Sequence, residues 1–401
     1  MQNDSALLIN KIARERKLLG YDVTNGSIGM MYFDDGKLPR NTIIREILSS
    51  HIKDEDLIYS SIPGEVEFRK LFADWYFKDE FNQEDVNTLT TPGGTGALFS
   101  SIIEEHFRFD NNILLFPDIG WPNYYGIASS YHLNFKEYSL FDDELKFNIK
   151  GIISLVDTLV KEGKHVTLVI NDPCHNPTGY SMNENEWNQL SSYITNNLKK
   201  DDMSLIIDCA YLDFAVETNK KHLVEAIKCV SNTIPVFICL SCSKAFSFYG
   251  LRCGELITII KDKETLIDIQ NRTLKIARGA WSNPNHMVVN TIIEVLSSTD
   301  GRRELTNEIR ACKNVINNRS SIFLKEAKEC NLKHYPYTEG FFITLICKDA
   351  SKVAELLMKE DIYLSPISEH NLRVALCAIP TEKMNGLAFK ISNAIKKSEE
   401  E

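Results

Sequence analysis

The most constraining feature of this sequence is a short apolar run that recurs, ends in polar or turn residues, and is followed by a helical pattern. The clearest runs are ILLFPD (113–118), TLVIND (167–172), SLIID (204–208), VFICLS (236–241) and ELITII (255–260). Four to six apolar residues without alternation are typical of strands buried on both faces, as in a parallel sheet. Strands of this kind separated by helices predict an α/β fold with a doubly wound sheet.

One of the intervening helices has a start signal of its own. Ser181 and Glu184 have the spacing of a capping box, and Trp187, Leu190 and Ile194 follow at helical spacing. We therefore expect a helix that begins directly after Ser181.

The C-terminal hundred residues follow a different pattern. A long helical pattern over about 302–330 precedes the apolar run 341–347, a helix near 351–360, and the runs IYLSPI and LRVALCAI. This order predicts a smaller α+β unit. The first forty residues hold one amphipathic helix that starts near Ser5, and we expect them to belong to that unit. The predicted domains are a large domain over 41–305 and a small domain formed by 1–40 and 306–401.

Composition excludes several classes of protein. Hydrophobic residues make up 43% and charged residues 25% of the 401 residues, which is enough for a sizeable core. The net charge of −10 argues against a surface that coats nucleic acid. No stretch approaches the roughly 18 apolar residues of a membrane span. The N-terminus lacks the apolar run of a signal peptide, so we expect a cytoplasmic protein.

Cysteine and histidine usage gives no sign of a metal site. The ten cysteines are too sparse for a disulfide scaffold. Cys239 and Cys242 have C-x-x-C spacing, but they lie inside an apolar run and no second pair completes a zinc site. We interpret both as buried core residues. The nine histidines form no H-E-x-x-H motif, so no catalytic metal is expected.

A glycine-rich turn, Thr91-Pro-Gly-Gly-Thr-Gly-Ala-Leu98, opens a predicted helix whose apolar face holds Leu98, Phe99, Ile102 and Ile103. Glycines allow backbone N–H groups to approach an anion, and a helix N-terminus supplies positive potential. The turn therefore suggests a phosphate cradle. It matches neither the P-loop nor the dinucleotide fingerprint, and such turns are more often structural than functional.

Polar residues follow the ends of two predicted strands, where open α/β sheets bind ligands. Asp208 ends one strand, with Tyr211 three residues later, and Ser241, Lys244 and Arg252 follow another. Taken singly, the aspartate would cap a helix and the lysine would be solvated. Together with a phosphate cradle, they suggest pyridoxal phosphate, with a Schiff-base lysine, a partner for the pyridinium nitrogen and a phosphate anchor.

These residues resemble the fold-type I aminotransferases, in particular the aspartate and aromatic aminotransferase subgroup, over about Ser27 to Arg373. The motifs that carry the resemblance are SIGMMYFDDGKLP (27–39), HNPTG (175–179) and SCSKAFSFYGLRCG (241–254). The resemblance implies a large domain, with a mostly parallel seven-stranded sheet between helices, and a smaller α+β domain.

The resemblance also implies the cofactor contacts. Lys244 would form the Schiff base, Asp208 would pair with the ring nitrogen, and Tyr211 and Asn176 would bind the phenolic oxygen. Trp121 would stack on the ring. The phosphate would be held by Gly94, Thr95, Ser241 and Arg252, and by Tyr59 from the other subunit of a homodimer. The family often has serine in place of Gly93, and histidine in place of Tyr124, where that histidine pairs with the aspartate.

The substrate contacts are implied in the same way. Arg373 would bind the α-carboxylate and Gly29 would lie over the substrate, next to Trp121 and Asn176. Arg278 would reach across the dimer to a side-chain carboxylate, which favours dicarboxylic substrates without excluding aromatic ones.

The implied reaction is a ping-pong transfer of an amino group between an L-amino acid and a 2-oxo acid such as 2-oxoglutarate or oxaloacetate, in which Lys244 moves the proton. One alternative is a lyase on the same fold, either a C–S β-lyase or a decarboxylase. Release of ammonia or pyruvate without an oxo acid would identify it. Another is a ligand-sensing regulator, but we expect no room for a DNA-binding module before Ser27. The sequence leaves the preferred amino donor open.

Overall fold

The computed structural model describes residues 5–39, 42–50 and 53–400. The chain divides into two compact units. The larger unit comprises Asn41–Pro173 and Ser181–Asn307, and the smaller unit comprises Met1–Arg40, Cys174–Tyr180 and Glu308–Glu401. The short segment Cys174–Tyr180 therefore belongs with the smaller unit, although its neighbours on both sides in the chain belong to the larger one.

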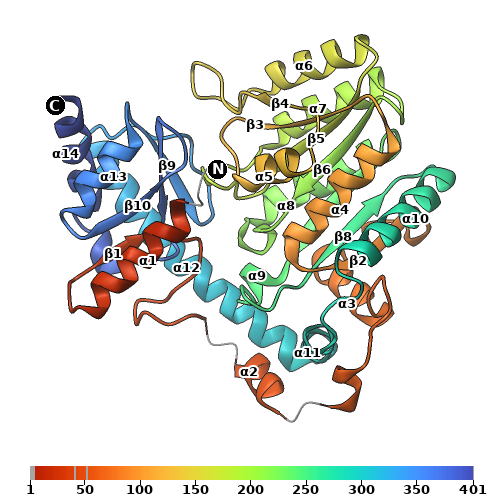
Figure 1. The fold of residues 1–401 in the computed structure, drawn as a ribbon, viewed down its shortest axis with the longest axis horizontal. Helices are drawn as coiled ribbons and strands as arrows, with labels where there is room; N and C mark the ends of the chain where they lie inside the picture. Colours follow the sequence, from red (N-terminus) through yellow and green to blue (C-terminus); the bar gives the residue numbers. More distant parts are fainter. Residues whose placement is uncertain (1–4, 40–41, 51–52, 401) are drawn as a thin grey trace. The chain divides into compact units, whose positions relative to one another are not determined.

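The larger unit is built on a seven-stranded sheet of order β2-β8-β7-β6-β5-β3-β4 (Figure 1). Its strands are β2 (Val86–Thr91), β3 (Asn112–Pro117), β4 (Phe135–Tyr138), β5 (His165–Asn171), β6 (Met203–Asp208), β7 (Val236–Ser241) and β8 (Gly254–Ile259). Every residue of β5, β6 and β7 is buried, which explains their unbroken apolar sequences. The predicted α/β fold with a mostly parallel sheet is confirmed.

Strand β8 is the exception, because it runs antiparallel to both of its neighbours, β7 and β2. The run 255–260 looked like the other buried strands, and its sequence gave no sign of the reversed direction. The chain between β7 and β8 contains only the short helix α9 (Cys242–Ala245). The backbone N–H of Cys242 donates to the carbonyl of Cys253 (3.0 Å), so the two arms of this connection continue the antiparallel pairing.

Helices of the larger unit pack on its sheet or on one another. They are α2 (Thr42–Ser49), α3 (Val66–Phe77), α4 (Gly93–Arg108), α5 (Asn123–Ser130), α6 (Ile149–Lys161), α7 (Glu184–Asn197), α8 (Glu217–Val230), α10 (Lys263–Ala280), α11 (His286–Ser297) and the start of α12 (Thr299–Glu329), with short 3₁₀ turns η1 (Asp54–Leu57), η2 (Gln83–Asp85) and η3 (Leu212–Phe214). Helix α4 packs against the central strands, and α10 packs on α4 (Figure 1). The predicted face of α4 is confirmed, since Leu98, Ile102 and Ile103 are buried in the core.

The start of α7 differs from the prediction. The helix begins at Glu184, and its capping box is formed by Asn183 and Glu186. The Asn183 side chain accepts from the N–H of Glu186 (3.1 Å), and the Glu186 carboxylate accepts from the N–H of Asn183 (2.9 Å). The capping box predicted at Ser181 is therefore wrong, because an equally good pair with the same spacing lies two residues later.

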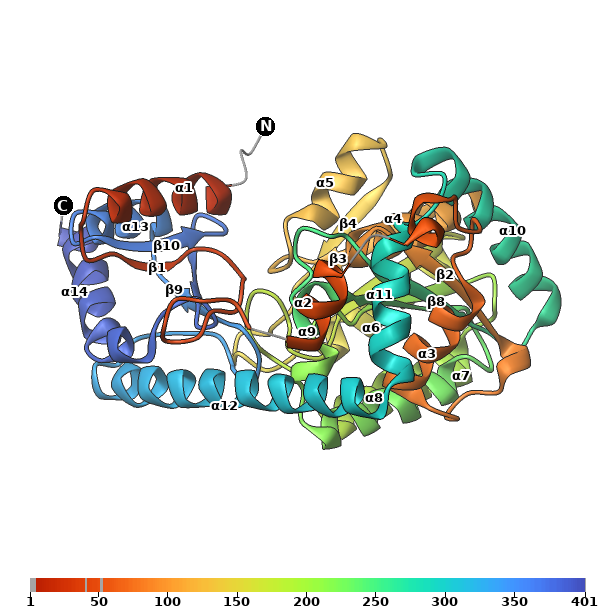
Figure 2. The same cartoon turned by 90° about the horizontal axis from the view of Figure 1, so that it is seen from below.

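The smaller unit is an α+β structure, as predicted (Figure 2). Its four-stranded sheet has the order β1-β10-β11-β9, formed by β1 (Thr24–Gly26), β9 (Phe342–Ile346), β10 (Ile362–Pro366) and β11 (Asn371–Ala375). The helices are α1 (Ser5–Leu18), α13 (Ala350–Met358), α14 (Leu387–Glu400), the 3₁₀ turn η4 (Thr381–Met384) and the remainder of α12. Strand β1 pairs in parallel with β10, so the N-terminal segment completes a sheet made from the C-terminal part of the chain.

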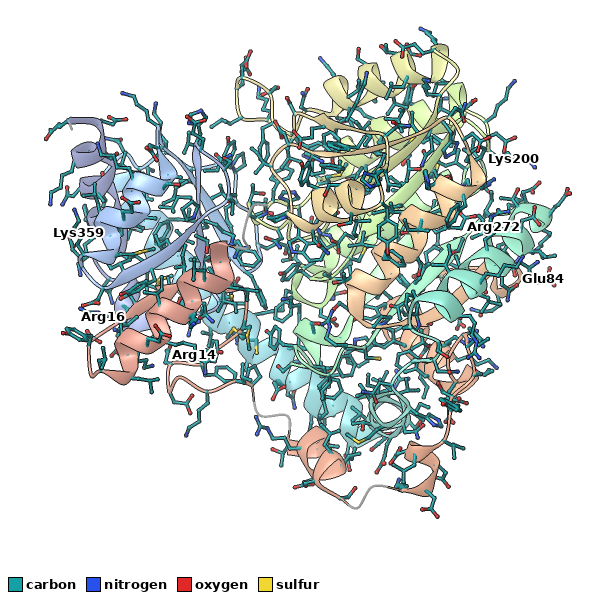
Figure 3. The ribbon with its side chains drawn as sticks, viewed as in Figure 1. Arg14, Arg16, Glu84, Lys200, Arg272 and Lys359 are labelled. Carbon is teal, nitrogen blue, oxygen red and sulfur yellow. The ribbon has the colours of Figure 1, made fainter. Side chains whose placement is uncertain are left out.

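Helix α1 packs on β10 through a small cluster of buried residues, Ile9, Ala13, Val23 and Tyr363. Near its end, Arg16 (labelled in Figure 3) donates to the carboxylate of Asp361 at 2.9 Å and lies over the ring of Tyr21. These contacts attach the N-terminal helix to the C-terminal sheet.

The segment Cys174–Tyr180 is held in the smaller unit by hydrogen bonds. The carbonyl of Gly179 accepts from the N–H groups of Thr338 (2.8 Å) and Glu339 (2.9 Å), and the Thr344 hydroxyl donates to the carbonyl of Pro177 (2.7 Å). Gly179 has φ +73°, and a Cβ there would lie 2.4 Å from the carbonyl oxygen of Phe342. A glycine is therefore required at this position of HNPTG.

Two further predictions concern single features. Cys239 and Cys242 are buried free thiols in the core, as interpreted from the sequence. Within the described residues, no helix has the length and apolar character needed to cross a membrane.

Candidate active site

The carboxyl ends of β6 and β7 place a buried carboxylate beside a lysine. Asp208 is the last residue of β6 and is 5% exposed. The Tyr124 hydroxyl donates to its Oδ2 at 2.7 Å, and the N–H of Ala210 donates to its Oδ1 at 3.2 Å. The Asn171 side chain donates to the main-chain oxygen of Asp208 at 2.7 Å. Each oxygen of the carboxylate therefore accepts a hydrogen bond, which holds the group in one orientation.

The charge of Asp208 depends on opposing effects. Burial raises the pKa of this carboxyl, while the hydrogen bonds from Tyr124 and Ala210 and the charge of Lys244 lower it, and the net direction is upward. Burial and the neighbouring Asp208 charge together raise the pKa of the Tyr124 phenol well above its usual range. Tyr124 therefore remains a protonated donor to the carboxylate.

Lys244 on α9 lies near two aromatic rings. Its Nζ is 5.2 Å from the ring centroid of Tyr211 and 4.9 Å from that of Tyr249. Such contacts favour the ammonium by about 0.5–2 kcal/mol, depending on exposure. Tyr211 was predicted to belong to the site, whereas Tyr249 was not. Its only sequence signal was its place inside the lysine motif.

The glycine-rich turn and the end of β7 come together around a guanidinium group. Gly93 opens α4 with φ +79°, and a Cβ there would lie 2.5 Å from Arg252 Nη2. A Cβ on Gly94 would lie 3.1 Å from the Cβ of Ser241. Arg252 therefore lies next to the place that a side chain at position 93 would occupy.

Arg252 is held by acceptors on both sides. Its Nη1 donates to the Ser243 hydroxyl (3.2 Å) and the Tyr249 carbonyl (3.1 Å), and its Nη2 donates to the Pro92 carbonyl (3.4 Å). An exposed guanidinium, the hydroxyl of Ser241 and the N-terminus of a 16-residue helix therefore lie together. This combination is typical of a phosphate site.

The predicted substrate residues Gly29, Asn176 and Arg373 come together in the smaller unit. Arg373 on β11 is 7% exposed. Its Nη1 donates to Asn176 Oδ1 (3.2 Å), and its Nη2 donates to the carbonyl of Ser27 (2.9 Å). The guanidinium lies 4.5 Å from the ring centroid of Phe342, and a Cβ on Gly29 would lie 2.5 Å from the same ring. Phe342 was not predicted, because it lies in an ordinary apolar strand.

The remaining predicted residues lie in the larger unit. Trp121 meets Tyr124 edge-on, with ring centroids 5.7 Å apart and an interplanar angle of 88°. Thr95 is half-buried in the first turn of α4. Tyr59 is 90% exposed, and Arg278 is exposed in the last turn of α10, where its Nη1 donates to the Ser282 hydroxyl (2.6 Å).

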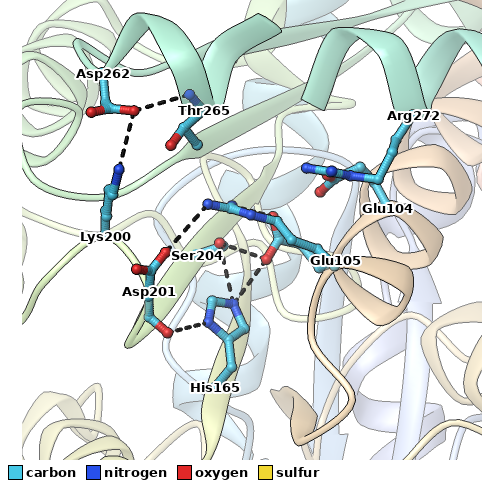
Figure 4. Close-up of polar contacts among 10 residues, drawn as sticks. Glu104, Glu105, His165, Lys200, Asp201, Ser204, Asp262, Thr265 and Arg272 are labelled. Atoms are coloured by element: carbon cyan, nitrogen blue, oxygen red, sulfur yellow. Dashed lines mark hydrogen bonds and ion pairs between the residues drawn. The ribbon is translucent and has the colours of Figure 1, made fainter. Parts of the chain in front are cut away.

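A second polar cluster lies at the amino ends of β5 and β6 (Figure 4), at the opposite edge of the sheet from Asp208. Glu105 on α4 accepts from His165 Nε2 (2.8 Å) and from the Ser204 hydroxyl (2.7 Å), while Arg272 on α10 donates to Glu104 (2.8 Å). We call these five residues the Glu105 network. It was not predicted, because its members are scattered through the sequence.

The Glu105 network shifts the pKa values of two adjacent glutamates in opposite directions. Burial and the neighbouring Glu105 raise the pKa of Glu104 well above its usual range. Burial also acts to raise the pKa of Glu105, but the hydrogen bond and charge of His165 and the charge of Arg108 lower it to about 2. The network therefore links α4 to the sheet through one buried carboxylate, and it is a structural feature.

The sheet has the strand order of a fold-type I transferase. A lysine, a buried carboxylate and an anion cradle lie at the carboxyl ends of its strands, and together they define the aminotransferase class. A sequence profile of the family "Aminotransferase class I and II" matches residues 21–391. The chain belongs to this family, so the predicted fold and enzyme class are confirmed.

Known proteins of this class are similar over most of the chain. An aminotransferase structure from Anaerococcus prevotii is 28% identical, with a TM-score of 0.90, and the match covers 98% of this chain and 97% of that one. Cytoplasmic aspartate aminotransferase from Saccharomyces cerevisiae is 18% identical, with a TM-score of 0.81 and coverage of 99% and 97%. The aromatic-amino-acid aminotransferase of Paracoccus denitrificans is 27% identical over 255 residues, and this match spans 63% of this chain and 62% of the relative.

Proposed function

We propose that this chain is a pyridoxal-phosphate-dependent aminotransferase. It moves an amino group between an L-amino acid, dicarboxylic or aromatic, and a 2-oxo acid such as 2-oxoglutarate or oxaloacetate. The observation that carries the proposal is the buried Asp208, held by Tyr124, on the strand next to the one that leads into Lys244. A solved aromatic-amino-acid aminotransferase from Burkholderia pseudomallei, 20% identical with a TM-score of 0.81 and coverage of 98% of both chains, holds covalently bound pyridoxal phosphate.

The residues of the larger unit fit this cofactor. The cradle of Gly93, Gly94, Ser241 and Arg252 is closely packed at its two glycines and presents donors suited to a phosphate. A buried carboxylate with two hydrogen-bond donors suits a protonated ring nitrogen, since the opposite charge favours the ionised acid. The residues we assign to cofactor binding are Lys244, Asp208, Tyr211, Asn176, Trp121, Gly94, Thr95, Ser241 and Arg252, with Tyr59 from the partner subunit.

When bound, the protonated pyridine ring supplies an electron sink for the substrate Cα. Asp208 would hold the proton on the ring nitrogen. The amine of Lys244 would take the proton from the substrate Cα and deliver it to the C4′ atom of the cofactor, and Tyr211 would donate to the phenolic oxygen. Arg373 binds the substrate α-carboxylate with its planar guanidinium and thereby orients the Cα–H bond. Gly29, Trp121 and Asn176 complete the proposed substrate contacts.

We further propose a homodimer in which Tyr59 and Arg278 reach the site of the other subunit. Both residues are exposed on a single chain, as this role requires. The neighbouring side chains of Leu57, Ile58 and Val66 are also exposed, which gives the same surface an apolar character. Arg278 would bind the side-chain carboxylate of aspartate, glutamate or their oxo acids.

The domain and location assignments are proposals as well. We assign residues 41–305 to the cofactor-binding domain, although the segment Cys174–Tyr180 within this range packs with the smaller unit, and residues 1–40 and 306–401 to the small domain. We place the enzyme in the cytoplasm. Amino acid and 2-oxo acid are its proposed partners, with no nucleic acid and no membrane.

The test is an assay of purified protein with pyridoxal phosphate, 2-oxoglutarate and a panel of amino donors. We expect glutamate to form with aspartate or with an aromatic donor. We also expect a visible absorbance band from the lysine-bound cofactor that Lys244→Ala removes. Release of ammonia or pyruvate without an oxo acid would assign the lyase reaction instead. Protein that stays colourless with pyridoxal phosphate would refute the proposal.

A further inference from the structure

Arg319 on α12 is a charged side chain in the interior of the smaller unit. It is 0% exposed, and a buried guanidinium is unfavourable unless its N–H groups find acceptors. Its Nη1 donates to the main-chain carbonyls of Leu376 (3.1 Å) and Cys377 (3.0 Å). Its Nη2 donates to the carbonyl of Tyr32 and to Asp34 Oδ1, both at 2.8 Å. One side chain therefore joins two segments that are far apart in the sequence.

These two segments are the ones that carry the proposed substrate residues. Tyr32 lies three residues after Gly29, and Cys377 lies four residues after Arg373. The N–H of Tyr32 donates to the carbonyl of Cys377 at 2.9 Å. Arg373 Nη2 donates to the carbonyl of Ser27, also at 2.9 Å. Two guanidinium groups, one on α12 and one on β11, therefore bridge the same pair of segments at different points.

Asp34 connects this arrangement to the surface of the smaller unit. Its Oδ1 accepts from Arg319 and also from the N–H (2.8 Å) and the hydroxyl (3.0 Å) of Thr381. Burial acts to raise the pKa of this carboxyl, but the hydrogen bonds from Arg319 and Thr381 and the charge of Arg319 lower it overall. Asp34 is therefore an ionised partner for the buried guanidinium.

The contacts of Arg319 require the shape of a guanidinium. This group presents its N–H donors in a fixed plane, so one end reaches the carbonyls that follow β11 and the other end reaches the N-terminal segment. An ammonium has three donors around a single atom. An apolar side chain would remove the donor from the carbonyls of Leu376 and Tyr32, and buried carbonyls without donors are unfavourable. We therefore expect the two segments to shift when Arg319 is replaced.

We propose that Arg319 is a positioning residue, which sets the geometry of the α-carboxylate site by holding the segment of Gly29 against the strand of Arg373. The inference rests on the proposed function, because it requires an amino acid or 2-oxo acid bound through Arg373. Arg319 acts through these two substrate residues and needs no contact with the substrate itself. Every amino acid and 2-oxo acid has an α-carboxylate, so the effect applies to dicarboxylic and aromatic substrates alike.

The test compares Arg319→Met and Arg319→Lys with the control Arg16→Met. Arg16 is a matched control, because it is another arginine of the smaller unit that joins the N-terminal segment to the C-terminal part of the chain, through Asp361 at 2.9 Å. The kinetic measurement gives kcat and KM for aspartate, phenylalanine and 2-oxoglutarate at saturating pyridoxal phosphate. Hydrogen exchange of the apoprotein is followed over residues 27–36 and 371–381, and the thermal midpoint of each variant is recorded.

The KM of Arg319→Met should rise for the amino donor and for 2-oxoglutarate by about tenfold to a hundredfold, which is the order expected when a positioning group moves by about 1 Å. Arg319→Lys should show a smaller rise. In both variants the two segments should exchange faster than in the wild type. The visible cofactor band should persist, because Lys244 and Asp208 belong to the larger unit. Arg16→Met should lose thermal stability and keep the wild-type KM.

A purely structural role for Arg319 predicts a different result. The variant would contain less active protein, so kcat would fall while KM stayed at the wild-type value, and this outcome would overturn the inference. An equal rise of KM in Arg16→Met would also overturn it. If Arg319→Met does not fold, Arg319→Lys decides, and a wild-type KM in that variant rejects the role. A wild-type chain that transaminates none of these substrates would instead overturn the proposed function, and the inference with it.

Discussion

Replacing Gly93 with serine tests whether the anion cradle depends on its close packing. Gly93 has φ +79°, and a residue with a side chain in this left-handed region is destabilised by roughly 1–2 kcal/mol. A Cβ would also lie 2.5 Å from Arg252 Nη2, where ordinary contact begins near 3.4 Å. The guanidinium would have to retreat by the difference, about 0.9 Å.

Arg252 has little room to make this movement without losing hydrogen bonds. Its three bonds, to Ser243, Tyr249 and Pro92, already measure 3.1–3.4 Å. A further 0.9 Å on any of them would break it. We therefore expect Gly93→Ser to weaken pyridoxal phosphate binding by about tenfold, the equivalent of about 1.4 kcal/mol and the low end for a lost charged hydrogen bond.

The assay measures the thermal midpoint of the apoprotein and the dissociation constant for pyridoxal phosphate. Gly163→Ser is the control for backbone strain, since Gly163 has φ +72° in the same unit and a Cβ there would meet nothing within 4 Å. Both variants should lose stability, and only Gly93→Ser should lose affinity. If Gly93→Ser binds the cofactor more tightly than the wild type, the new hydroxyl contributes a phosphate contact and our account of the cradle is wrong.

Three further predictions follow from the site and the Glu105 network. Lys244→Ala should abolish transamination and the visible cofactor band, and retained turnover would remove this lysine from the mechanism. Arg278→Asp should depress kcat/KM for aspartate by more than tenfold while sparing aromatic donors, because it replaces an attractive charge with a repulsive one; an unchanged donor preference would contradict this role. Since the pKa of Glu105 is lowered to about 2, the folded chain binds fewer protons there than the unfolded chain, whose glutamate titrates near 4.5. The stabilisation is present above about pH 4.5 and is lost as the pH falls toward 2, so the thermal midpoint should decline over this window less steeply in Glu105→Gln than in the wild type, and equal slopes would refute the assignment.

The buried strands were predictable because burial on both faces produces a continuous apolar sequence. The edge strands were not. Strand β2 (VNTLTT) is half-buried over its first half, and β4 (FKEY) is exposed at three of its four residues. Both lie at the ends of the sheet order, where one side of the strand has no neighbour within the sheet and polar residues are tolerated. The sequence therefore identified the central strands of the sheet and missed its two edge strands.

Much of the candidate site was also predictable, because its residues lie in short motifs next to strand ends. Asp208 terminates an apolar run, and Lys244 follows another. The resemblance to a known family then supplied roles for residues such as Asn176 and Arg373, whose chemistry is not evident from their neighbours in the sequence. Tyr249 and Phe342 were not predicted, because an aromatic side chain at either position gives no sign of a functional role.

The sequence by itself determined the α/β class, the alternation of the buried central strands with helices, and the candidate reactive groups. These properties are local, since they depend on the periodicity and chemistry of neighbouring residues. The tertiary structure decided the reversed direction of β8, the contact of Tyr124 with Asp208 and the assembly of the Glu105 network. The direction of β8 depends on its pairing with β7 and β2, and the other two depend on segments far apart in the chain. Local patterns carry no information about which strand or side chain will lie beside a given position.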